Sequence, residues 1–144
     1  MIRIKAVCKD RQPMDQQPTG ELMTRTLAMP ADANPSGDIF GGWVMSQMDL
    51  AGGICAGTRA RGRVVTVAVK SMSFIQPVQV GDLLCVYTRI LKLGRTSMEI
   101  HIEAWAKRRR NRDFDRVTEA NFTFVALDEA GRPTPVPAGD VDNH

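Results

Sequence analysis

The chain has 144 residues, of which 43% are hydrophobic and 24% charged, and its formal net charge is +3. This length accommodates one domain around one core, and the composition is typical of a globular protein. No apolar run reaches the roughly 20 residues that a membrane-spanning helix needs, and the first residues lack a secretory apolar region. We therefore expect a cytoplasmic, single-domain protein without a membrane span.

Cysteine and histidine usage narrows the possible chemistry. Cys8, Cys55 and Cys85 are odd in number and lack metal-site spacing, which argues against a disulfide framework and against a zinc site. The two histidines are His101 and the last residue, His144. His101 lies on the polar side of an alternating segment, where a solvated side chain is the simpler interpretation. Relays of a nucleophile and an imidazole are therefore disfavoured.

In chain order, residues 1–20 mix Gln, Pro and charged residues without periodicity, which predicts a flexible N-terminal tail. The domain is expected over residues 21–137, and residues 138–144 follow a proline-rich stretch as a C-terminal tail. The domain begins with a short strand, Glu21 to Leu27, and a long loop from Met29 to Gly37.

A helix is predicted to start near Gly41. Val44, Met48, Ala51 and Cys55 recur at the spacing of one helical face, which predicts a buried stripe. At 100° per residue, Asp49 falls at the edge of this stripe, where a carboxylate can face a cleft.

Four strands follow the helix. Residues 65–74 alternate with a change of phase that indicates a bulge, residues 83–91 are continuously apolar, and residues 97–104 and 116–127 alternate. We expect these strands to form a meander. One helix cannot cover a five-stranded sheet on both faces, so the fold class is α+β, with an antiparallel sheet wrapped around the lone helix. The outer face of the sheet is then solvated or paired with another subunit.

Candidate site residues lie at the start and in the middle of this helix. The amides of Gly41 and Gly42 could bind an oxyanion, or the glycines could serve turn geometry alone. The pair Gly52-Gly53 costs helix stability and suggests close approach to a second helix or to a substrate tail. Asp49 could deprotonate water or attack a carbonyl itself. An exposed helix carboxylate without a role is the alternative.

A basic run, Lys107-Arg108-Arg109-Arg110-Asn111-Arg112, has three possible interpretations. It could be a solvated loop, a nucleic-acid patch, or a clamp for a phosphorylated ligand. Aromatic residues do not interleave with the arginines, which disfavours nucleic acid.

One long segment resembles a known family. The block Gly37-Asp38-Ile39-Phe40-Gly41-Gly42-Trp43-Val44-Met45-Ser46-Gln47-Met48-Asp49, preceded by Leu27-Ala28-Met29-Pro30, is similar to the YciA-type acyl-CoA thioesterases. The similarity continues through residues 62–67, Met72-Ser73-Phe74, Val80-Gly81-Asp82, Thr118-Glu119-Ala120 and Phe124-Val125-Ala126, and covers roughly residues 22–137. An ordered series of this length is far more specific than a short motif.

The resemblance implies a hotdog fold, with a five-stranded antiparallel sheet wrapped around one long central helix. It implies hydrolysis of acyl-CoA thioesters in fatty acid metabolism, with broad acyl-chain specificity and with neither a metal nor an organic cofactor. It also implies homodimers with the active site at their interface, commonly assembled as a trimer of dimers, a homohexamer.

By position, the catalytic residues are Asp49, Asn34, Gly41 and Gly42. Candidates for binding the CoA portion are Arg63, Thr66, Ser73, Lys107, Arg108 and Arg109. The chain departs from the family pattern at Ser36, where the family usually has a second Asn, and in the number of arginines in the basic run.

Other functions stay open at this point. An acyl-CoA-binding regulator would keep the fold and have little turnover, but Asp49 together with Gly41-Gly42 favours an enzyme. A hotdog dehydratase would require a histidine beside its carboxylate, and the sequence has none near the helix.

Overall fold

The computed structural model describes residues 16–139, so most of both predicted tails, together with Cys8 and His144, lies outside the described residues. The elements are, in order, β1 (Glu21–Leu27), the 3₁₀ turn η1 (Pro30–Asp32), α1 (Gly41–Ala60), β2 (Val64–Phe74), β3 (Leu83–Leu93), β4 (Ser97–Lys107) and β5 (Phe114–Ala126). The helix starts at the predicted residue.

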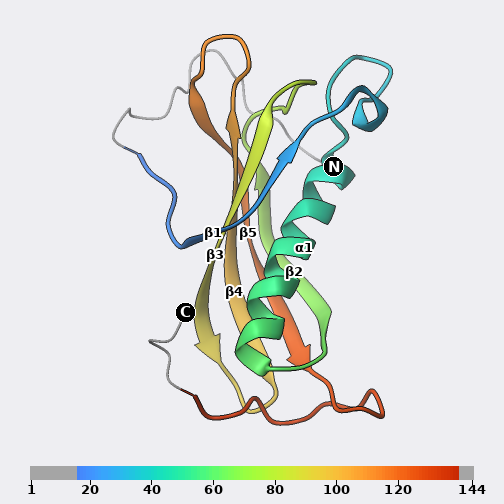
Figure 1. The fold of residues 1–144 in the computed structure, drawn as a ribbon, viewed down its shortest axis with the longest axis vertical. Helices are drawn as coiled ribbons and strands as arrows, with labels where there is room; N and C mark the ends of the chain where they lie inside the picture. The colour runs from blue at the N-terminus through green and yellow to red at the C-terminus, as the bar shows by residue number, and fades with distance from the viewer. Residues whose placement is uncertain (1–15, 140–144) are drawn as a thin grey trace.

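The five strands form one antiparallel sheet in the order β1-β3-β4-β5-β2. The curved sheet wraps along one side of α1 (Figure 1), which confirms the predicted hotdog architecture. The predicted meander holds only for β3, β4 and β5. β2 pairs with β5 and not with β3, because the connection of residues 75–82 carries the chain from one edge of the sheet to the other side.

The core lies between α1 and the concave face of the sheet. Val44, Met48 and Ala51 are buried as predicted, whereas Cys55 is only partly buried. The large buried side chains of the same core include Ile100 on β4 and Phe122 on β5.

At Gly52 the helix packs closely on the sheet. A Cβ atom there would lie 2.6 Å from Ile102 Cδ1 and 2.8 Å from Phe124 Cε2. The predicted close approach is therefore real, but the neighbour is the sheet of the same chain and neither a second helix nor a ligand. A methyl group at Gly53 would meet nothing within 4 Å.

The predicted bulge in β2 is confirmed. The register against β5 shifts between Lys70 and Ser73, and Ser71 has a φ of 56°. A bulge bends the strand and increases its twist, so the end of β2 at Phe74 turns toward the start of α1.

The outer face of the sheet carries a polar cluster in place of the solvated histidine that was expected. The His101 side chain is 15% exposed, and its ring nitrogens lie 2.8 Å from Asn121 Oδ1 and 3.2 Å from Glu103 Oε2. Glu103 also accepts hydrogen bonds from Trp105 Nε1 and Thr19 Oγ1. Since its neighbours hold the ring away from the helix, His101 has no part in the candidate site.

Candidate active site

The loop before α1 is shaped around Asn34. Its side-chain oxygen accepts the backbone amides of Ser36 at 2.9 Å and Asp38 at 3.1 Å. An asparagine in this role reproduces a turn with its own side chain. The carbonyl oxygen is thus occupied, and the side-chain NH2 group is the donor that Asn34 can offer to a ligand.

The helix start presents a second set of donors. Phe40 caps α1 without a side-chain hydrogen bond, and the amides of Gly41 and Gly42 precede any intrahelical acceptor. The positive end of the helix dipole adds to their attraction for negative charge.

A cavity of about 230 Å³, which we call the helix-start cavity, opens beside these donors. Its polar lining includes Asn34, Asp38 and Gln76, Gly41 borders it, and its apolar wall includes Phe74 and Val117. Apolar walls with a few convergent donors are typical of sites for an apolar substrate with one polar reacting group.

Asp49 lies on another part of the helix surface. Its carboxylate is exposed and accepts a hydrogen bond of 2.5 Å from the Thr66 hydroxyl on β2. Asp49 lies eight residues after Gly41, which corresponds to about 12 Å along the helix axis. One copy of the chain therefore does not bring Asp49 and the Gly41 amide to the same carbonyl group.

An apolar surface surrounds the pair of Asp49 and Thr66. On α1, Leu50 and Ile54 are 58% and 50% exposed, and on β2 Val67 is 53% exposed between Val65 and Val69. Because β2 is an edge strand, its free hydrogen-bonding groups and apolar side chains favour pairing with another chain.

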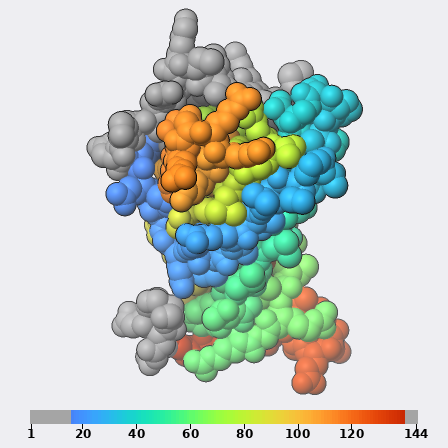
Figure 2. Space-filling model, turned by 45° about the horizontal axis from the view of Figure 1, so that its top comes forward, coloured from blue at the N-terminus to red at the C-terminus, as the bar shows by residue number. Residues whose placement is uncertain are grey.

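The basic run forms the hairpin between β4 and β5, shown in orange in Figure 2, where it lies against the yellow-green segment that precedes β3. Arg109 and Arg110 are exposed and line a groove of about 770 Å³ that also touches Gln76 and Pro77. We call this hollow the basic groove.

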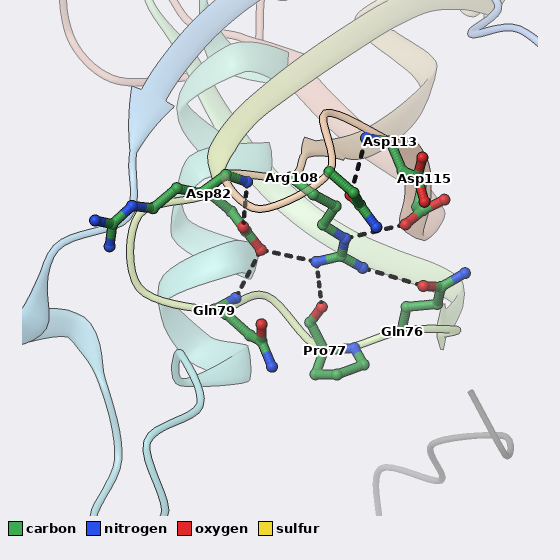
Figure 3. Close-up of polar contacts among 9 residues, drawn as sticks. Gln76, Pro77, Gln79, Asp82, Arg108, Asp113 and Asp115 are labelled. Carbon is green, nitrogen blue, oxygen red and sulfur yellow. Dashed lines mark hydrogen bonds and ion pairs between the residues drawn. The ribbon is translucent and has the colours of Figure 1, made fainter. Parts of the chain in front are cut away.

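Arg108 is placed differently from its neighbours in the run. Its guanidinium is turned inward onto Gln76, Pro77, Asp82 and Asp115 (Figure 3), and its side chain is 14% exposed. Sequence reasoning grouped it with the exposed arginines. The turn at Val80-Gly81-Asp82 next to an apolar strand was the one signal that a buried acidic partner existed.

The remaining predicted CoA-binding residues are spread over the molecule. Lys107 and Ser73 are exposed near the helix-start end of the sheet, whereas Arg63 precedes β2 at its opposite end. Ten residues of strand separate Arg63 from Ser73, or about 33 Å. Within one chain the structure does not bring these residues together.

The described cysteines lie away from both hollows and are free thiols. Burial raises the pKa of Cys55 and of Cys85, which keeps both in the neutral, unreactive form.

Within residues 16–139, no group of three or more His, Cys, Asp or Glu side chains is arranged to hold a metal ion. No helix in the same part of the chain is long and apolar enough to cross a membrane.

Comparison with known proteins identifies the family. The model of the thioesterase superfamily matches residues 36–111. The acyl-CoA thioester hydrolase YciA of Salmonella typhimurium is 54% identical over 127 residues, which cover 86% of this chain and 96% of that protein. The chain is a YciA-type member of the thioesterase superfamily.

Solved structures agree with this assignment. The hexameric thioesterase y2039 from Yersinia pestis is 55% identical, covers 85% of this chain and 100% of its own, and superimposes with a TM-score of 0.82. HI0827, a hexameric broad specificity acyl-coenzyme A thioesterase, is 52% identical over 87% of this thioesterase and 86% of its own chain, also with a TM-score of 0.82. HI0827 has also been solved as an aspartate-to-alanine mutant enzyme.

The region that matches the superfamily model contains most of the candidate site of this thioesterase. It includes Gly41, Gly42, Asp49, Thr66 and the basic run up to Asn111, whereas Asn34 lies just before it and Arg112 just after it.

Proposed function

We propose that this thioesterase hydrolyses acyl-CoA thioesters to a free carboxylate and CoA. The observation that carries the proposal is the pair of free amides of Gly41 and Gly42 at the start of α1, where Gly41 borders the helix-start cavity, in a family whose relatives are acyl-CoA thioester hydrolases. Asp49 supplies the carboxylate, and its hydrogen bond to Thr66 fixes the orientation of that group.

In the proposed reaction, the thioester carbonyl oxygen accepts hydrogen bonds from the amides of Gly41 and Gly42, which stabilise the oxyanion as a tetrahedral intermediate forms. Asp49 either removes a proton from the attacking water or attacks the carbonyl carbon to give an anhydride that water then hydrolyses. In both routes a C–O bond replaces the C–S bond, and the released sulfur takes up a proton. All groups come from the protein, the substrate and water, so the proposal includes neither a metal nor an organic cofactor.

The site is proposed to combine two copies of the chain, with Asp49 from one copy and Asn34, Gly41 and Gly42 from the other. The separation of about 12 Å between Asp49 and Gly41 along one helix supports this, as does the exposed apolar surface on Leu50, Ile54 and Val67. Because relatives are hexameric, we expect a homohexamer, assembled as a trimer of dimers.

Arg109 and Arg110 are proposed to bind the phosphates of the CoA nucleotide in the basic groove. Both are exposed, and a guanidinium pairs with a phosphate through two parallel hydrogen bonds. Lys107, Ser73 and Arg63 stay predictions for the same portion of the substrate.

Broad acyl-chain specificity is expected from the apolar wall of the helix-start cavity. Met45 on the adjoining helix is only partly buried, and a flexible methionine adapts to chains of different length, whereas Met48 is fully buried in the core. The proposed setting is fatty acid metabolism in the cytoplasm.

The test follows release of free thiol from acyl-CoAs of different chain lengths by the parent protein and by Asp49→Ala and Asp49→Asn. Both substitutions should lower kcat by at least about a hundredfold, since they remove the general base or the nucleophile, while circular dichroism and melting temperature stay near parental. Near-parental turnover by Asp49→Ala would disprove the role of Asp49. Tight binding without hydrolysis by the parent would favour a binding protein over an enzyme.

A further inference from the structure

Arg108 lies at the junction of two loops that are far apart in the sequence. Its Nη1 donates to the Pro77 carbonyl oxygen and to Asp82 Oδ2, both at 2.8 Å. Its Nη2 donates to Gln76 Oε1 and its Nε to Asp115 Oδ2, both at 3.0 Å. Figure 3 shows the guanidinium at the centre of these four partners. We call this set of contacts the Arg108 junction.

Two of the four partners of Arg108 are more deeply buried than those of a surface ion pair, and Asp115, with its side chain 26% exposed, is the more open ion-pair partner. Gln76 is 7% exposed and Asp82 is 3% exposed. The Asp82 carboxylate also accepts the amides of Gln79 at 2.9 Å and Arg109 at 3.3 Å. Four of the five N–H groups of the guanidinium donate to groups of its own chain, so its main role is to hold these groups and not to bind phosphate.

The residues that Arg108 fixes form a wall shared by two hollows. Gln76 and Pro77 line the helix-start cavity with Asn34 and Gly41, and they also line the basic groove with Arg109 and Arg110. Displacement of this wall would therefore alter both hollows together.

The same junction sets the direction of Arg109. A Cβ atom at Gly81 would lie 2.7 Å from Arg109 Cδ, so the side chain of Arg109 crosses directly over the glycine. Gly81 has a φ of 93°, which glycine adopts without strain. The turn at Gly81-Asp82 therefore has two roles: Asp82 accepts a hydrogen bond from Arg108, and Gly81 lies under the aliphatic part of Arg109, a proposed phosphate ligand.

We propose that Arg108 is a positioning residue for thioester hydrolysis, holding the Gln76-Pro77 wall so that a substrate held in the basic groove places its thioester at the helix-start cavity. This inference rests on the proposed acyl-CoA hydrolysis. It separates Arg108 from Arg109 and Arg110, which would act on the nucleotide directly.

The test compares two substrates with the same acyl group, an acyl-CoA and the acyl thioester of pantetheine, which lacks the nucleotide. A phosphate ligand acts only on acyl-CoA and mainly through KM. A residue that positions the cavity wall acts on both substrates and lowers kcat, because a shift of about 1 Å at a reacting centre costs up to about a hundredfold in rate.

Arg108→Lys keeps the charge but not the fork that reaches four acceptors. We expect kcat to fall by at least about tenfold on both thioesters, in line with the rate cost of misplacement. Gln76→Met removes one acceptor and leaves both ion pairs of Arg108, so the variant should fold and lose about threefold to tenfold in kcat on both thioesters. Arg112→Gln is the matched control, since Arg112 is an exposed arginine of the same hairpin outside both hollows, and it should be parental with both substrates.

Parental kcat of folded Arg108→Lys and Gln76→Met with the pantetheine thioester would overturn the inference. An effect confined to KM for acyl-CoA would also overturn it, in favour of a phosphate contact. A loss of activity that only matches the loss of folded protein would reduce Arg108 to a stability role and would overturn it as well. Absence of acyl-CoA hydrolysis by the parent would disprove the proposed function instead, so the two failures are distinct.

Discussion

At the scale of single residues, the hydrogen bond between Thr66 and Asp49 is the contact on which the proposed chemistry depends most directly. The Thr66 hydroxyl lies 2.5 Å from Asp49 Oδ1, a short distance that is typical of a donor to an ionised carboxylate. Thr66 was predicted as a contact for CoA. In the structure its hydroxyl donates a hydrogen bond to the Asp49 carboxylate, so Thr66 would influence the reaction by orienting Asp49.

Thr66→Val preserves shape and removes this donor. We expect kcat to fall by roughly tenfold, because a hydrogen bond to a charged group contributes about 1.5–3 kcal/mol, while KM changes less. Thr66→Ser retains the hydroxyl, so its kcat should stay within about twofold of the parental value. A twofold change is much smaller than the tenfold change that corresponds to about 1.4 kcal/mol. Steady-state kinetics of thiol release measures both variants, and equal kcat for Thr66→Val and the parent would contradict the role.

At the scale of elements, the part of the fold that depends on local pattern was predictable and the part that depends on distant pairing was not. The helix, its buried stripe and the bulge in β2 follow from periodicity within a few residues. The neighbours of β2 do not, since strands of similar pattern pair equally well in several orders. The inward direction of Arg108 depends on Asp82 and Gln76, which are 26 and 32 residues away, so the basic run by itself suggested an exposed arginine.

The packing of α1 on the sheet gives a prediction for Gly52. A methyl group there would lie 2.6 Å from Ile102 Cδ1, and overpacking of a buried site costs about 1–3 kcal/mol. Because two Phe124 ring atoms also lie 2.8 Å from that position, we place the cost in the upper part of this range, above the gain of about 1 kcal/mol from replacing a helical glycine by alanine. We therefore expect Gly52→Ala to lower the free energy of unfolding.

Gly53→Ala is the matched control for this prediction. A methyl group there meets no atom of the same chain within 4 Å, so within one subunit the helix propensity of alanine should leave stability equal or raise it by up to about 1 kcal/mol. Denaturant unfolding measures both variants. Equal stabilisation by the two substitutions would show that the sheet moves away from Gly52 without cost.

At the scale of the whole molecule, one chain holds two halves of the proposed site without joining them. Gly41 and Asn34 border the helix-start cavity, whereas Asp49, farther along α1, is hydrogen-bonded to Thr66 on the edge strand β2. In a dimer with twofold symmetry, each contact occurs twice. Two complete sites then arise from two incomplete chains, each with Asp49 from one copy and the helix-start donors from the other.

This arrangement predicts complementation between inactive subunits. Asp49→Asn removes the carboxylate, and Asn34→Asp keeps the oxygen that shapes the loop but removes the NH2 donor, so each variant alone should be nearly inactive. Coexpressed in equal amounts, they form mixed dimers in which one site carries both changes and the other carries neither. With random pairing in a twofold dimer, about a quarter of parental activity should return.

Mass spectrometry shows whether the assembly is mixed. If a mixed assembly has no more activity than the separate variants, a site shared between chains is contradicted. That result would require Asp49 to reach the helix-start donors of its own chain, against the separation of about 12 Å that the helix imposes.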